Sequence, residues 1–204
     1  MLSDRPLRDL LAAFASSDPT PGGGSASAVA SAIGASLLTM VASLPKTRSS
    51  SDEDRSALAA ARQALTGITH QLTEAIDNDS LAYDGVVAAY KLPKASEPEQ
   101  AARKAAIQRA LRSATDVPLG VVRLSVLALR EAAAVAAHGH RAAASDVGVA
   151  VALLSAGARG ARLNVDINLG SLNDGSYAEA VKVESAGLAS EAAELAAAAE
   201  ASLR

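Results

Sequence analysis

The sequence has no cysteine, and aromatic residues make up only 2% of its 204 positions. The lack of cysteine excludes a disulfide framework and a thiolate zinc site. With so few aromatic residues, the hydrophobic half of the chain must build its core from Ala, Val, Leu and Ile. Abundant alanine favours helix and lets neighbouring helices approach closely. We therefore expect an all-α protein, a single-domain bundle over residues 1–204 with about six to eight helices.

Neither sign of charge is in large excess, because the formal net charge is −3. This balance gives no indication of a nucleic-acid or acidic-membrane partner. The first five residues contain no apolar signal core. Serines, or charged residues such as Arg123 and Glu131, interrupt the most hydrophobic runs, so we expect no membrane span. These features predict a cytoplasmic protein with no membrane or nucleic-acid partner.

Hydrophobic periodicity and capping signals predict where the helices begin and end. The expected helices cover residues 6–15, 25–44, 52–90, 96–115, 119–137, 145–168 and 177–203. The apolar stripe of the longest helix consists of Leu58, Leu65, Ile68, Leu72 and Ile76. We expect a break or a kink at Asp116-Val117-Pro118, since proline cannot donate a helical hydrogen bond. The slim helix 25–44 suits a buried position between neighbours.

The stretch Pro19-Thr20-Pro21-Gly22-Gly23-Gly24-Ser25 leads into that slim helix. The prolines hold the chain extended, and the glycines permit close approaches that a Cβ would forbid. Such a loop leaves backbone N–H groups unpaired, which suits an anion or the polar edge of a ligand. The spacing matches neither a Walker loop nor a dinucleotide-binding turn. A rigid turn between two helices is the alternative.

Three further groups of polar residues lie where packing alone does not require them. Asp79 follows a clean apolar stripe and shares a helix face with Tyr83, for which a solvated face is the alternative. Lys94 follows a helix end, where it either complements the helix dipole or pairs with a substrate carboxylate. Ser145 and Asp146 either cap a helix or contribute to a site.

Asn164 and Asn168 are four residues apart, so both amides lie on one helical face of an otherwise apolar segment. A polar pair in this position is costly unless a partner helix or a ligand satisfies it. His138 and His140 are a weak metal signal, because no third ligand lies nearby. We expect no metal site.

In combination, these residues resemble the cyclodeaminase/cyclohydrolase family of folate enzymes. The resemblance covers nearly the whole chain. Its motifs, in order, are Pro19 to Ser25, Asp79 with Tyr83, Leu92-Pro93-Lys94, Val117-Pro118-Leu119, Ser145-Asp146, Asn164-Val165 and Ile167-Asn168-Leu169. The resemblance implies an all-helical domain that forms a homodimer and acts on a tetrahydrofolate derivative. We expect the last helix and the slim helix to lie near the subunit contact.

The resemblance also implies the chemistry and the roles of the residues. The family reactions hydrolyse 5,10-methenyl-tetrahydrofolate to 10-formyl-tetrahydrofolate, or close formimino-tetrahydrofolate with release of ammonia. Both need a carboxylate near a cation and a proton shuttle, and neither needs a metal or redox cofactor. The expected catalytic residues are Asp79, Asp146 and His140. The expected substrate-binding residues are Gly22, Gly23, Gly24, Ser25, Tyr83, Lys94, Ser145, Asn164 and Asn168.

Two positions depart from the family pattern. The family commonly has Gly-Asn where this chain has Gly139-His140, and an acidic residue where Leu81 stands. We favour the cyclohydrolase reaction, with the cyclodeaminase reaction as the alternative. These departures keep open a non-catalytic folate-binding protein, and a plain structural bundle is the remaining possibility.

Overall fold

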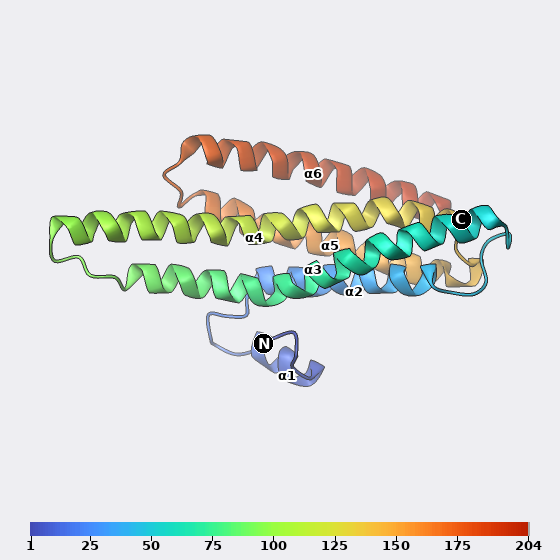
Figure 1. Cartoon of the computed structure of the whole chain (residues 1–204), viewed down its shortest axis with the longest axis horizontal. Helices are drawn as coiled ribbons and strands as arrows, with labels where there is room; N and C mark the ends of the chain where they lie inside the picture. The colour runs from blue at the N-terminus through green and yellow to red at the C-terminus, as the bar shows by residue number, and fades with distance from the viewer. Residues whose placement is uncertain (204) are drawn as a thin grey trace.

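The computed structural model describes residues 1–203 and folds them into six α-helices and one short 3-10 helix, η1 (Figure 1). The elements are α1 (Leu7–Phe14), α2 (Gly23–Ala42), α3 (Asp52–Tyr90), α4 (Glu97–His138), η1 (Arg141–Ala143), α5 (Ala144–Leu169) and α6 (Gly175–Ser202). The expected all-α bundle is confirmed, with six helices at the lower end of the expected number.

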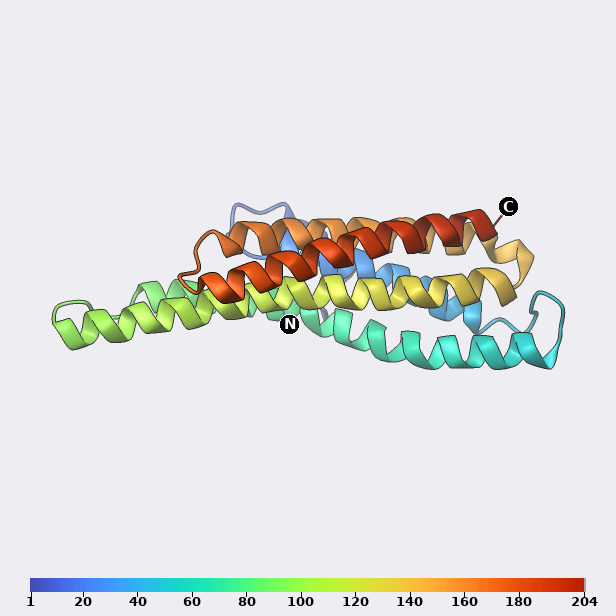
Figure 2. The same cartoon turned by 90° about the horizontal axis from the view of Figure 1, so that it is seen from above.

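Five of the helices, α2 to α6, pack side by side with their axes nearly aligned (Figures 1 and 2). α2 contacts α3, α4 and α5, whereas α6 covers α4 and α5 on the other side of the bundle. The hairpin of α3 and α4 is longer than its neighbours and projects beyond them at one end. The start of α2 therefore lies part-way along this hairpin, and this position creates the candidate site described below.

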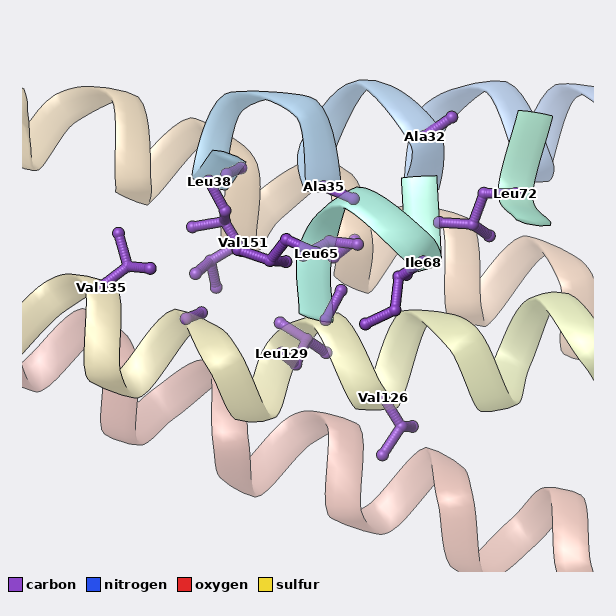
Figure 3. Packing of buried hydrophobic residues seen from close by; sticks show 14 of the residues in the cluster. Ala32, Ala35, Leu38, Leu65, Ile68, Leu72, Val126, Leu129, Val135 and Val151 are labelled. Atoms are coloured by element: carbon purple, nitrogen blue, oxygen red, sulfur yellow. The ribbon is translucent and has the colours of Figure 1, made fainter. Parts of the chain in front are cut away.

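The core is built mainly from leucine, valine and alanine (Figure 3). Leu65, Ile68 and Leu72 of α3 lie between α2 and α4, and the whole predicted stripe of α3 is buried. α2 meets α5 so closely that a Cβ on Gly157 would lie 2.0 Å from the hydroxyl of Ser31. The same hydroxyl pairs with Ser125 of α4 at 2.7 Å. The predicted buried position of this slim helix is confirmed.

α4 corrects the expectation of a break at residues 116–118, because it runs as one helix of 42 residues through Pro118. A proline inside a helix leaves the carbonyl four residues earlier, here that of Ala114, without its usual donor. The side-chain amide Nδ2 of Asn168 in α5 donates to that carbonyl at 2.8 Å. α4 continues because a neighbouring helix supplies the hydrogen bond that the proline removes.

α1 stands apart from the bundle (Figure 1). Leu10 is its only buried residue, while Leu7 is 67% and Leu11 is 59% exposed. The residues before α1 are held by the buried carboxylate of Asp77 in α3, which accepts hydrogen bonds from the Leu2 N–H and the Ser3 hydroxyl. The N-terminal segment is thus anchored at one point, and the apolar face of α1 covers little of the chain.

Two segments are long and apolar enough to cross a membrane by length and composition alone, namely α2 and residues 141–169. More than half of the apolar window in α2, 56%, is buried inside the bundle, as in the core helix of a globular domain. The window in the second segment is 39% buried, and one exposed edge of α5 is apolar.

Candidate functional site

A pocket of about 310 Å³ lies where α2 begins, enclosed by α3, α4 and α5. Its lining consists of Pro19, Thr20, Gly22, Gly23, Gly24, Asp79, Tyr83, Val86, Leu111, Ala114, Asn164 and Asn168. The volume is near the lower end of the range for small-molecule sites. Four elements thus bring together the glycine loop, Asp79, Tyr83 and the two asparagines, which are up to 146 positions apart in the sequence.

Asp79 is held against the first turn of α2. One of its carboxylate oxygens, Oδ2, accepts hydrogen bonds from the Ser25 N–H at 2.7 Å and from the Ser25 hydroxyl at 2.9 Å. The other oxygen, Oδ1, lies directly over Gly24, where an added Cβ would stand 2.0 Å from it. Gly24 is therefore required for this approach, and the N-terminal end of α2 adds a favourable field for the carboxylate.

Ser25 corrects one expectation, because its side chain is fully buried behind Asp79 and does not line the pocket. The single proton of its hydroxyl is shared between Asp79 and the carbonyl of Ile76, since both acceptors lie 2.9 Å from Oγ. Ser25 positions Asp79 and leaves ligand contact to the residues in front of it. The N–H groups of Gly23 and Gly24 have no acceptor among residues 1–203, as the loop motif predicts.

The environment of Asp79 tunes its acidity. Burial raises the pKa of its carboxyl, because the charged form loses solvation, and the two hydrogen bonds from Ser25 act in the opposite direction. The net shift of the pKa is upward. A half-buried carboxyl with a raised pKa, accessible from a pocket, is suited to proton transfer.

The two asparagines present acceptor oxygens to the pocket. Nδ2 of Asn164 donates to the carbonyl of Gly160 at 2.9 Å, and Nδ2 of Asn168 donates to Ala114. Neither Oδ1 has a donor among residues 1–203. A partner helix therefore satisfies the amide nitrogen of Asn168, as one alternative expected, whereas the nitrogen of Asn164 bonds within its own helix; both oxygens stay available to a ligand.

Sequence reasoning missed part of the lining. Val86 lies seven residues after Asp79, on the same face of α3, and helical spacing could have identified it. Thr20 lies inside the glycine-loop motif but was not singled out. Leu111 and Ala114 come from α4 with no polar signal, so only the packing of α4 against α3 identifies them.

Four predicted site residues lie elsewhere in the subunit. Ser145 and Asp146 occupy the first turn of α5, whereas the pocket uses the last turns of that helix. Asp146 is 18 residues from Asn164, which corresponds to about 27 Å along the helix axis. His140 lies at the same distant end, where its Nδ1 accepts from the Ala142 N–H at 3.2 Å. Lys94 lies in the exposed loop at the tip of the α3–α4 hairpin and does not line the pocket.

No group of three or more metal-ligating side chains occurs among residues 1–203. His138 instead pairs through Nδ1 with Asp54 at 2.9 Å, which joins the end of α4 to the start of α3. This hydrogen bond, together with one from the Ser49 N–H, holds the pKa of Asp54 well below its usual range. The pair has a structural role at the end of the bundle opposite the pocket.

A second hollow, of about 330 Å³, lies between α5 and α6 and is lined by alanines, Ser155, Arg159 and Arg162. Among residues 1–203, no carboxylate and no side-chain amide lines it. Of these two pockets, the one at the start of α2 combines a carboxyl of raised pKa, amide oxygens and N–H groups without an acceptor among the described residues. We therefore take it as the candidate active site.

Comparisons with known proteins identify relatives of this chain. A sequence profile of the family described as formiminotransferase-cyclodeaminase matches residues 6–187. The chain is 40% identical to the methenyltetrahydrofolate cyclohydrolase of Methylorubrum extorquens over 195 residues, which are 96% of this chain and 94% of that protein. It is 34% identical to the mouse formimidoyltransferase-cyclodeaminase over 87% of its length but covers only 33% of that protein.

The fold has a close counterpart among solved structures. The formiminotetrahydrofolate cyclodeaminase of Thermotoga maritima superimposes with a TM-score of 0.88 at 25% identity, over 100% of this chain and 98% of that structure. The chain therefore spans nearly the full length of the bacterial relatives and about a third of the mouse protein.

Proposed function

The chain belongs to the formiminotransferase-cyclodeaminase family, and from this premise we propose that it is a methenyltetrahydrofolate cyclohydrolase. The reaction hydrolyses 5,10-methenyl-tetrahydrofolate to 10-formyl-tetrahydrofolate. One observation carries the choice between the family reactions: the 40% identity to a cyclohydrolase extends over nearly the whole of both chains. The identities to the mouse and Thermotoga cyclodeaminases are 34% and 25%.

The pocket supports this reaction through the position of Asp79. The substrate carries a delocalised positive charge over N5, the bridging carbon and N10, so a carboxylate beside the carbon attracts it. Asp79 is the one carboxylate that lines the pocket among residues 1–203. The bonds from Ser25 hold that carboxylate in place, so it does not need to reorganise when the cation arrives.

The hydrolysis then proceeds through a tetrahedral adduct. A water oxygen attacks the bridging carbon while the Asp79 carboxylate accepts a proton from that water. The protonated Asp79 returns the proton to N5 as the bond between N5 and the carbon breaks. Loss of the remaining hydroxyl proton leaves the formyl C=O on N10, so the balance is one water consumed and one proton released.

The acceptor oxygens of Asn164 and Asn168 suit the donor edge of a pterin, which presents an amino group and a ring N–H. The unpaired N–H groups of Gly23 and Gly24 suit the acceptor atoms of the same ring system. Tyr83 is 42% exposed at the rim and offers an aromatic surface to the part of the substrate outside the pocket. These contacts would orient the bridging carbon toward Asp79.

We further propose that the protein acts as a homodimer in the cytoplasm and needs no metal or redox cofactor. The family resemblance supports the dimer, and a hydrolysis by proton transfer supports the absence of a cofactor. The roles proposed here for Asp79, Tyr83 and the two asparagines rest on their convergence in one pocket.

A spectrophotometric assay tests the proposal. Purified protein is mixed with methenyl-tetrahydrofolate, and the loss of its near-ultraviolet absorbance is compared with the uncatalysed rate. We expect acceleration, and we expect Asp79→Asn to reduce it by roughly 10²–10⁴-fold because the proton acceptor is lost. Asp84→Asn, an exposed change five residues later on α3, is the matched control and should keep the wild-type rate.

The second candidate is a formimino-tetrahydrofolate cyclodeaminase, which the 34% identity to the mouse protein and the Thermotoga fold both favour. Ammonia release from formimino-tetrahydrofolate, without acceleration of methenyl hydrolysis, would select it. Binding of both folates without turnover of either would instead indicate a folate-binding protein with no catalytic activity.

A further inference from the structure

α6 lies alongside both α4 and α5 and presents different residues to each of them (Figure 2). Toward α4 it carries glutamates that pair with arginines. Arg123 donates two hydrogen bonds to Glu184, at 2.6 and 2.8 Å. Arg130 likewise donates to Glu191 at 2.7 Å. Toward α5 it carries alanines, namely Ala189, Ala192 and Ala193. Arginines of α5 on this side therefore face alanine where those of α4 face glutamate.

These arginines, Arg159 and Arg162, line the hollow of about 330 Å³ between α5 and α6. They are three residues apart on one helix face, so their like charges repel each other. Among residues 1–203, Arg159 has no ion-pair partner, and Arg162 has Asp166, whose Oδ2 lies 3.8 Å from Nε. That pair stabilises the fold little, because its side chains are 40% and 46% exposed. The hollow thus carries positive charge that the described part of the chain leaves largely uncompensated.

Two polar atoms of the lining are buried without a hydrogen-bond partner among residues 1–203, namely Oγ of Ser155 and Nε of Arg162. Other buried hydroxyls in the helices donate to the carbonyl four residues earlier, as those of Thr115 and Ser125 do at 2.8 and 2.7 Å. The hydroxyl of Ser155 makes no such bond. A buried polar atom is costly unless it is paired, so this wall of the hollow is suited to a ligand with acceptor oxygens.

The rest of the lining is apolar. Ala158 of α5 and the three alanines of α6 complete the wall, and Ala158 is only 3% exposed. We propose that the hollow binds a small organic anion, with its carboxylate on Arg159 and Arg162 and its apolar body against the alanines. A guanidinium matches the plane of a carboxylate through paired N–H donors. The hydroxyl of Ser155 supplies a further donor to the same ligand.

The proposed anion site lies across α5 from the candidate active site. The two pockets share no lining residue in the described part of the chain. Arg162 and Asn164 are two residues apart, so their side chains leave the helix on nearly opposite sides. The active-site pocket has the opposite charge, because the carboxyl of Asp79 lines it and no lysine or arginine among residues 1–203 does. An organic carboxylate therefore favours the α5–α6 hollow, and this proposal does not depend on the proposed function.

Titration calorimetry with phenylbutyrate tests the proposal, since this probe joins a carboxylate to an apolar body. With about a dozen non-hydrogen atoms, it should bind with a Kd on the order of 1 mM or tighter. Phenylbutyramide has the same body without the charge and should bind at least about tenfold more weakly. Acetate and inorganic phosphate lack the apolar body and should also bind at least about tenfold more weakly.

Substitutions in the hollow give the second readout. Arg159→Leu and Arg162→Leu should each weaken phenylbutyrate binding by about tenfold or more, because each removes a charged donor and keeps an apolar side chain of similar reach. Ala189→Leu keeps both arginines but fills the hollow, so it should also prevent binding. Arg141→Leu, an exposed change just before α5, is the matched control and should bind as the wild type does. Asp79→Asn should do the same, because its pocket is not the one used. Circular dichroism of each variant shows that the bundle is folded.

A footprint locates the probe while both arginines are kept. The chain has no cysteine, so Ala193→Cys introduces a single thiol at the exposed edge of the hollow. Saturating phenylbutyrate should slow alkylation of this thiol by N-ethylmaleimide severalfold. The matched control is Ala198→Cys, an exposed position on another side of α6, where the alkylation rate should not change.

Several results would overturn the proposal. Phenylbutyrate that does not bind at millimolar concentration would do so, as would equally tight binding of the amide or of phosphate. Wild-type affinity in Arg159→Leu and Arg162→Leu, or equal protection of both thiols, would indicate association elsewhere on the surface. Loss of binding in Asp79→Asn would move the probe to the other pocket and reject the anion site. None of these results bears on folate hydrolysis, so the proposed function stands or falls by its own assay.

Discussion

Substitution of Gly24 tests directly whether the position of Asp79 controls activity. A Cβ at this position would lie 2.0 Å from Oδ1, 2.5 Å from Cγ and 2.7 Å from Oδ2 of Asp79. A Cβ atom does not approach a non-bonded heavy atom within 3.0 Å in folded proteins, so the carboxylate of Asp79 must move away by at least about 1 Å. The retreat stretches the bonds from Ser25, which are 2.7 and 2.9 Å long in the wild type.

The expected effect of Gly24→Ala follows from that displacement. A misplacement of about 1 Å at a reacting group costs on the order of 100-fold in rate, so kcat/KM should fall by about that factor. Stability is subject to two opposing effects. Alanine gains about 1 kcal/mol of helix propensity over glycine, while a weakened hydrogen bond to a charged group costs about 1.5–3 kcal/mol. We expect a net loss of roughly 0.5–2 kcal/mol, too little to unfold the bundle.

Two further glycine substitutions complete the series. A Cβ on Gly67 in α3 would meet nothing within 4 Å, so Gly67→Ala should gain stability by about 1 kcal/mol and keep full activity. A Cβ on Gly23 would lie 3.3 Å from Nδ2 of Asn164, so Gly23→Ala should raise KM with a smaller effect on kcat. Steady-state hydrolysis and thermal unfolding by circular dichroism measure both quantities. A folded Gly24→Ala protein with wild-type kcat/KM would refute the role given to Asp79.

Three other outcomes are expected. Burial raises the pKa of Asp79, so the acid limb of the pH profile of kcat/KM should lie above the ordinary aspartate pKa of about 3.9. This limb should be absent in Asp79→Asn. An acid limb at or below that value would contradict the role of Asp79 as the proton acceptor. Asn168→Ala should lower the free energy of unfolding by about 1–3 kcal/mol in the wild type. In a Pro118→Ala background the loss should be much smaller, because the backbone N–H at position 118 then donates to the carbonyl of Ala114. If urea unfolding showed that the losses from the two substitutions are additive, Asn168 and Pro118 would not be coupled. The pKa of Asp54 is lowered in the folded protein, so its ionised carboxylate stabilises the fold above the ordinary aspartate pKa, and this stabilisation is lost as the pH falls through the folded value. Calorimetry should therefore show that the difference in Tm between wild type and Asp54→Asn decreases below about pH 4. A difference that stays constant with pH would exclude this role for the bond between Asp54 and His138.

The sequence determined the helices and much of the pocket. The apolar stripe from Leu58 to Ile76 repeats at the helical period, which is a local property, and α3 covers residues 52–90, as periodicity and capping signals together predict. The glycine loop, Asp79, Tyr83, Asn164 and Asn168 were each recognisable as polar or glycine-rich signals in apolar surroundings, and all of that group except Pro21 and Ser25 line one pocket. The family likewise follows from motifs in a fixed order along the chain, whereas the identity of 40% to a cyclohydrolase carries the choice between the family reactions.

Only the tertiary structure decided where those signals meet. Pro118 predicts a helix break from local chemistry, and the break is absent because Asn168, distant in sequence, supplies the missing donor. Ser145, Asp146, His140 and Lys94 share the motif order with the pocket residues but lie at the ends of long helices. Each residue adds about 1.5 Å of rise along a helix, so side chains that are many residues apart on one long helix lie far apart in the subunit. Which ends become neighbours depends on how helices and subunits pack, and helical periodicity carries no information on that.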